Sequence, residues 1–142
     1  MVIKNKKYEL FSHTADIGLF VYGKNLNELF HHAGEAFTDL ISEAKTIQPT
    51  EKRTIQIKGE NDEELLIHFL KELLYLFEVD KILFSRFDFS LWNKKSVQCE
   101  MVGEFFDEKK HPFKTELKAV TYHQLKIEKW KDGLKATVVL DV

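Results

Sequence analysis

Two aspartates near opposite ends of the chain have the residue type that a metal site needs. Asp16 ends the polar run HTAD at residues 13–16, and Asp141 follows an apolar run just before Val142. Carboxylate and main-chain oxygens are the ligands that hard cations such as Ca²⁺ and Mg²⁺ prefer. Each feature also has an ordinary explanation, since Thr14 and Asp16 can cap a turn and Asp141 can lie in a solvated chain end. The residues alone leave both interpretations open.

The sequence contains no other recognisable catalytic or cofactor motif. The six glycines form neither a GxGxxG nor a GxxxxGK[ST] phosphate loop, and no GxSxG motif occurs. The single cysteine, Cys99, and the scattered histidines lack zinc-ligand spacing. Cys99 lies in an alternating run, which favours buried packing. Four histidines are expected on solvated surfaces: His31, His32, His68 and His111.

Length and composition favour one globular domain covering residues 1–142. Hydrophobic residues make up 44% and charged residues 31% of the chain. The formal net charge of −2 argues against a face that grips nucleic acid through phosphates. No apolar run approaches the roughly 20 residues of a membrane span, and the basic N-terminus is not followed by an apolar signal region. We therefore expect a cytoplasmic protein with no membrane partner.

The first half of the chain predicts strands and helices in alternation. Strands are predicted at residues 8–12 and 17–23, followed by a helix that begins after Asn25. A further strand is predicted at residues 53–58, and a second helix begins after Asn61. Each asparagine has a glutamate three positions later, as in a capping box, and apolar residues at helical spacing then form one buried stripe.

The second half predicts strands joined by tight turns. Residues 82–92 alternate, with Phe87 and Leu91 on one face, and residues 96–106 alternate through to Phe105. Asn93-Lys94-Lys95 joins these two strands.

Two more strands are predicted around residues 122–130 and at 134–141. Asp132-Gly133 joins them, and the glycine is expected to take a positive φ. The whole order predicts an α+β fold, a layered single domain with two helices packed on a mixed, largely antiparallel sheet.

Four short runs resemble the archease family. They are HTADIG at residues 13–18, ELL with FLKELL between residues 64 and 74, KAVTYH at 118–123 and VLDV at 139–142. They occur in the family's order and span nearly the whole chain. One departure is Ser12, where many archeases carry an aspartate, and it removes a possible extra carboxylate.

The resemblance implies an archease-like fold and a divalent metal site, with Ca²⁺ as the expected ion. Its ligands here would be Asp16, Asp141 and Val142, the last through a main-chain oxygen or its terminal carboxylate. Such a site requires the last strand to lie beside residues 12–17.

The resemblance also implies a function. Archeases are partners of the RtcB-type GTP-dependent RNA ligase, which joins RNA ends in tRNA splicing or repair. We therefore expect a non-enzymatic activator that promotes ligase guanylylation and multiple turnover, and that meets nucleic acid only through the ligase. Two alternatives are a chaperone-like modulator of nucleic-acid-modifying enzymes such as methyltransferases, and a small metal-dependent hydrolase using both aspartates.

The run at residues 118–123 has two interpretations as well. It can be a strand in which Val120 and Tyr122 pack inward. Alternatively, Lys118 and His123 can line a partner surface near the acidic site.

Overall fold

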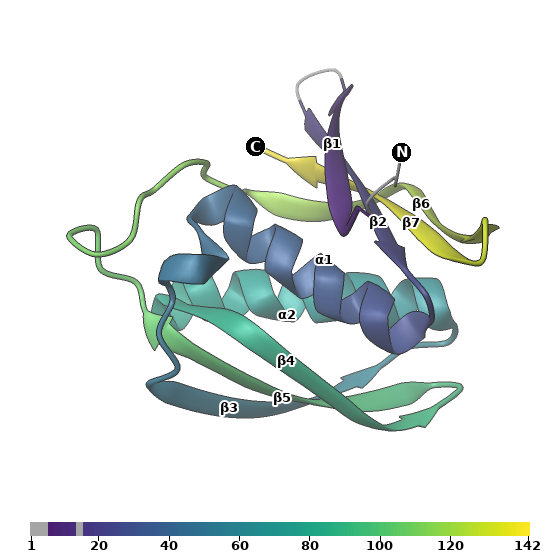
Figure 1. Cartoon of the computed structure of the whole chain (residues 1–142), viewed down its shortest axis with the longest axis horizontal. Coiled ribbons are helices and arrows are strands. Elements are labelled where there is room, and N and C mark those ends of the chain that lie inside the picture. Colours follow the sequence, from purple (N-terminus) through teal and green to yellow (C-terminus); the bar gives the residue numbers. More distant parts are fainter. Residues whose placement is uncertain (1–5, 14–15) are drawn as a thin grey trace, which may run out of the picture.

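The protein is built in layers, with two helices between two antiparallel sheets (Figure 1). The computed structural model describes residues 6–13 and 16–142. In chain order the elements are β1 (Tyr8–His13), β2 (Asp16–Gly23), α1 (Leu26–Ile41), the short 3₁₀ helix η1 (Ala44–Thr46), β3 (Glu51–Lys58), α2 (Asp62–Asp80), β4 (Ile82–Asn93), β5 (Ser96–Phe105), β6 (Ala119–Trp130) and β7 (Gly133–Asp141).

The strands divide into a four-stranded sheet of order β1-β2-β7-β6 and a three-stranded sheet of order β3-β5-β4. Every strand pair in the described part of the chain is antiparallel. Helix α1 packs between β2 and β4, and α2 contacts β6 and β3. The predicted α+β class and its layered packing are confirmed. The strands form two sheets rather than the single sheet predicted, because the last strand, β7, pairs with β2. This places the four-stranded sheet on the opposite side of the helices from the sheet of β3, β5 and β4 (Figure 1).

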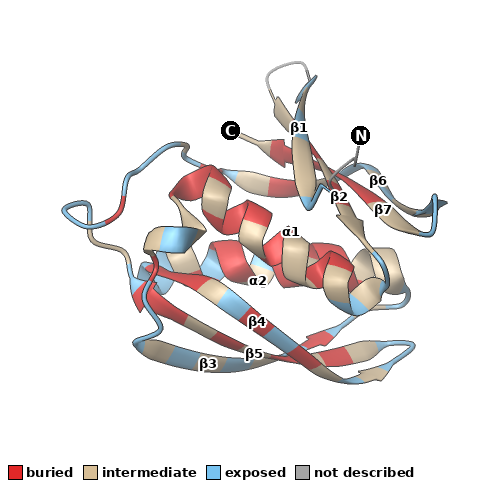
Figure 2. Cartoon of the chain, viewed as in Figure 1, coloured by how far each residue is buried: buried red, intermediate tan, exposed pale blue. Residues whose placement is uncertain are grey.

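The helix starts follow the predicted caps. The Asn25 side chain accepts the N–H of Glu28 at 2.9 Å, and the Asn61 side chain accepts the N–H of Glu64 at 2.9 Å. Both helices bury a wider arc than a single stripe, as the buried Ile67 shows, because sheets cover them on two sides (Figure 2). Within the described ranges, no helix is both long and apolar enough to cross a membrane.

The predicted alternation of buried and exposed side chains fails at the ends of β4 and β5. Leu91 was predicted on the same face as Phe87, which is buried, but Leu91 has φ 54° at a register shift before Asn93 and is 72% exposed. The bulge inverts the alternation, so Trp92 packs towards the core instead. Phe105, predicted to continue the alternation of this strand, is 47% exposed at the last position of β5, and the neighbouring Glu104 is buried instead.

The β6–β7 hairpin forms where predicted but uses its glycine differently. Lys131 and Asp132 make the turn, and Lys131 has the positive φ of 54°. Gly133 begins β7 without a positive φ, so that expectation was wrong. A Cβ at Gly133 would lie 2.4 Å from the main-chain oxygen of Gly23. The glycine is therefore needed for the close approach of two chain segments.

Candidate functional site

Asp16 and Asp141 are direct neighbours across strands β2 and β7. The antiparallel register places them opposite each other, with Ala119 of β6 on the far side of Asp141. Residues opposite each other in a ladder share a face of the sheet. Leu19 and Leu140 point into the core, so the two aspartates project from the outer face. The structure therefore brings together the two residues that the sequence singled out.

The two aspartates place like charges opposite each other in the sheet. Side chains directly opposite in an antiparallel pair have Cβ atoms about 5 Å apart, and like charges at that separation destabilise a sheet. Both Asp16 and Asp141 are half-buried, which reduces the screening of their repulsion by water. A cation between the carboxylates would remove this repulsion.

The end of β7 is held in place by main-chain contacts. The main-chain oxygen of Asp141 accepts the N–H of Lys118 at 2.8 Å. Val142 is half-buried and packs against the edge of the core. Asp141 is therefore paired on both sides rather than lying in a frayed, solvated end, and the Val142 main chain lies within one residue of the acidic pair.

The donor set suits a hard cation but does not complete its shell. Among residues 6–13 and 16–142, no group of three or more His, Cys, Asp or Glu side chains is arranged to hold a metal ion. Ca²⁺ takes six to eight oxygen ligands. Asp16, Asp141 and a main-chain oxygen of Val142 supply only part of that number. The remaining ligands of a bound ion would come from water or from a binding partner.

The HTAD run is described only in part. Residues 14–15 lie outside the described residues, so the alternative in which Thr14 caps a turn is not addressed. Ser12 pairs with Ile17, one position away from Asp16, and therefore belongs to the opposite face of the hairpin. A carboxylate in place of Ser12 would therefore project from that opposite face.

The run at residues 118–123 forms the start of β6, and its inward packing is only partly as predicted. Val120 is buried as predicted, but Tyr122 is 54% exposed, so its inward packing was wrong. A four-residue bulge in β6 carries Tyr122 outward, where the Lys71 ammonium lies 4.4 Å from its ring centroid. Lys118 and His123 are both exposed, and Lys118 lies next to the acidic pair through its main-chain bond.

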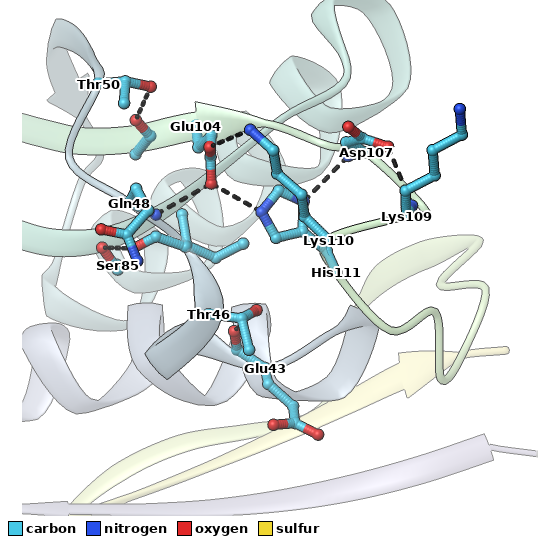
Figure 3. A network of polar contacts seen from close by, with 12 residues as sticks. Glu43, Thr46, Gln48, Thr50, Ser85, Glu104, Asp107, Lys109, Lys110 and His111 are labelled. Atoms are coloured by element: carbon cyan, nitrogen blue, oxygen red, sulfur yellow. Dashed lines mark hydrogen bonds and ion pairs between the residues drawn. The ribbon is translucent and has the colours of Figure 1, made fainter.

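The expectation that His111 is solvated was wrong, since it is only 1% exposed. Figure 3 shows its ring hydrogen-bonded to Glu104 and to Asp107. Its Nδ1 accepts the N–H of Asp107 at 2.9 Å, and its Nε2 lies 2.7 Å from a Glu104 carboxylate oxygen. Nε2 therefore carries the hydrogen and donates a hydrogen bond to the Glu104 carboxylate. The Gln48 N–H, then His111 and Lys110, hold the pKa of Glu104 below its ordinary value. This network ties the β5–β6 connection to the sheet, and sequence reasoning missed it.

The other histidines anchor the helices rather than lying free in solvent. His31 and His32 bond the main-chain oxygens of strands β4 and β2, one from each sheet, and His68 bonds that of β3. His31 also pairs with Glu35 at 2.8 Å, which raises the pKa of His31 above its ordinary value. All three are half-buried at helix edges, and the helical histidines do not converge on one ion.

The match to known proteins covers nearly the whole chain. The model of the archease protein family matches residues 8–142. The archease of Methanosarcina barkeri is 43% identical over the full length of both chains, and that of Sulfurisphaera tokodaii is 37% identical over 96% of this chain and 99% of its own.

Two solved structures share the fold. The solution structure of Methanobacterium thermoautotrophicum protein 1598 is 32% identical, covers 96% of this chain and 99% of its own, and superimposes with a TM-score of 0.83. A Thermotoga maritima crystal structure, described as an archease and possible chaperone, has a TM-score of 0.68 at 22% identity, over 100% of this chain and 99% of its own. On these matches and on its fold, the chain belongs to the archease family.

Proposed function

We propose that this protein activates an RtcB-type GTP-dependent RNA ligase without being an enzyme itself. In this role it promotes guanylylation of the ligase and lets the ligase turn over repeatedly during tRNA splicing or RNA repair. Membership of the archease family supports the proposal. The observation that carries it is the pairing of Asp16 with Asp141 across β2 and β7.

The active element in this proposal is a divalent cation, with Ca²⁺ as the first candidate. Asp16 and Asp141 would hold it through their carboxylates and Val142 through a main-chain oxygen. A bound cation would neutralise the two carboxylates and offer open coordination positions to oxygen atoms of the ligase. Because the two carboxylates project from the outer face of the sheet, a docked partner could reach them directly.

The test is a guanylylation assay with purified ligase, GTP and Mn²⁺, followed over several turnovers. The variants Asp16→Ala and Asp141→Ala should lose stimulation while keeping the fold. Asp88→Ala is the matched control, because Asp88 also faces an acid, Glu100, across two antiparallel strands, but in the other sheet. Normal stimulation by the Asp16 and Asp141 variants would show that the acidic pair is not the active element.

A chaperone-like role is the second candidate, favoured by the description of the Thermotoga maritima protein as a possible chaperone. It predicts that the protein suppresses aggregation of several unrelated enzymes, and that Asp16→Ala does so equally well. A metal-dependent hydrolase would instead turn over a substrate with no ligase present. Asp16 and Asp141 are the residues to replace in that case.

A further inference from the structure

The outer face of the four-stranded sheet carries four aromatic side chains. They come from three strands: Phe11 from β1, Phe20 and Tyr22 from β2, and Trp130 from β6. The solvated face of an antiparallel sheet is normally polar. Here Trp130 is 41% exposed, and the other three rings are half-buried. We call these four residues the aromatic face.

The rings lie against one another and against the backbone of the sheet. Phe11 and Phe20 stack with centroids 4.3 Å apart and an interplanar angle of 21°. The Phe11 ring covers Gly18, where a Cβ would lie within 2.1 Å of the ring. Tyr22 and Trp130 follow with centroids 6.2 Å apart. A glycine beneath the first ring therefore lets the row lie flat along the sheet.

Two lysines lie beside the aromatic face. The Lys135 ammonium lies 4.0 Å from the Phe20 centroid and 4.4 Å from the Trp130 centroid, between the two rings. The Lys131 ammonium lies 5.9 Å from Trp130. Within the described part of the chain, neither lysine forms an ion pair with an acidic side chain. Lys135 nevertheless lies opposite Glu128 across β6 and β7 and attracts the Glu9 carboxylate of β1, so an anionic ligand would compete with these two acids for Lys135.

We propose that the aromatic face binds single-stranded RNA directly, in contrast to the expectation, from the net charge of −2 and the family resemblance, that the protein meets nucleic acid only through the ligase. A base takes the place of the Lys135 ammonium beside Phe20 and Trp130, and Lys135 and Lys131 then contact the backbone phosphates. Proteins commonly bind single-stranded nucleic acids with flat aromatic rings, on which bases stack, and neighbouring cations, which contact the phosphates. An apolar protein surface would fit less well, because it would cover the lysine ammonium groups without offering them an anionic partner of its own. The proposal does not depend on the metal site or on ligase activation.

The location of the aromatic face adds a geometric constraint. Lys135 and Asp141 lie on the same face of β7, six positions apart, which corresponds to roughly 20 Å along a strand. RNA bound on the aromatic face would therefore extend towards the acidic pair, which lies at the far end of the same strand. Neutralising that pair should help RNA binding or leave it unchanged.

The test is fluorescence anisotropy with a labelled ten-nucleotide single-stranded RNA at several salt concentrations. Trp130→Ala should weaken binding about tenfold, as expected for the loss of one stacked base, whereas Trp130→Phe should keep most of it. Replacing Lys131 and Lys135 together by Gln should reduce the slope of log affinity against log salt by about 1.4. Lys94→Gln, at the β4–β5 turn of the other sheet, is the matched control and should bind like the wild type.

Three results would overturn the proposal. The first is no RNA binding by the wild-type protein at low salt. The second is equal binding by the wild type and Trp130→Ala, with Trp130→Ala showing only a lower melting temperature, which would mean that the rings only stabilise the sheet. The third is that the same substitutions abolish binding to the ligase protein but not to RNA. Asp16→Ala should still bind RNA, so a failure of the ligase proposal can be told apart from a failure of this one.

Discussion

Replacing Asp141 by asparagine should change the stability of the protein in opposite directions with and without calcium. The wild type holds two carboxylates opposite each other on β2 and β7. At about 6 Å, two unit charges repel by roughly 0.7 kcal/mol in water and roughly 1.4 kcal/mol at an effective dielectric constant of 40. For half-buried groups we take about 1 kcal/mol. Without metal, Asp141→Asn should therefore be more stable by about 1 kcal/mol, which raises the melting temperature by about 3 °C.

With saturating calcium the order should reverse. An ion present at 100 times its dissociation constant stabilises the native state by about 2.7 kcal/mol, or about 8 °C for a chain of this size. Asp141→Asn lacks one of the two carboxylates and should shift by less than about 2 °C. The measurement is thermal unfolding by circular dichroism in EGTA and in a calcium titration, repeated with magnesium.

Asp88→Asn is the control for this experiment. Asp88 lies opposite Glu100 on β4 and β5, but the Lys52 ammonium already lies 3.1 Å from Glu100. Removing the Asp88 charge should change the melting temperature by less than about 2 °C and leave any calcium response as in the wild type. If Asp141→Asn were less stable than the wild type in EGTA and showed the same calcium shift, the reasoning from repulsion and neutralisation would be refuted.

Three other substitutions test an ion pair, a close backbone contact and a position with positive φ. The pKa of Glu35 is lowered to about 2, first by His31, whose own pKa is raised. The contribution of ionised Glu35 to the free energy of unfolding is therefore present above about pH 4.5 and is lost as the pH falls towards 2. The contribution of protonated His31 is present below about pH 6.5 and is lost as the pH rises through its raised pKa. Glu35→Gln should lower the free energy of unfolding most between pH 4.5 and 6.5, by about 1–2 kcal/mol after allowance for partial exposure. Urea unfolding at pH 3 and at pH 8.5 should show a smaller loss. Gly133→Ala should lower the free energy of unfolding in urea by about 1–3 kcal/mol, because the new Cβ would overlap the main-chain oxygen of Gly23. An unchanged unfolding midpoint would show that the two chain segments can move apart to make room for it. Leu91→Asn should raise stability by up to about 1 kcal/mol, because Leu91 is exposed at positive φ; a loss would mean that its side chain makes a contact that matters.

The local elements could be predicted well because their signals are local. Asn25 and Asn61 accept main-chain N–H groups within their own first turns, so the helix starts depend on a few neighbouring residues. The turns after β4 and β6 likewise join strands that are adjacent in the chain. The errors at Leu91 and Tyr122 occur at bulges, where non-glycine residues with positive φ reverse the alternation. Packing of the whole sheet decides such positions, so a periodic pattern does not reveal them.

Burial of polar side chains was harder to predict. His111 lies in a charged stretch, which made solvent exposure the natural expectation. In the fold, the β5–β6 connection turns His111 back onto Glu104, and the hydrogen bonds to Glu104 and Asp107 offset the cost of burying the imidazole. That arrangement depends on a contact between a loop and a strand, for which the sequence carries no periodic signal.

The sequence by itself determined which residues could serve as oxygen donors: Asp16 in the HTAD run and Asp141 beside Val142 at the end of an apolar strand. It also determined the order of helices and strands. Only the tertiary structure decided that β7 pairs with β2, and in which register. A slip of one residue would turn Asp141 to the opposite face, away from Asp16. Leu140 and Val138 must point into the core between the helices and the sheet, and their burial fixes the register that brings the two aspartates together.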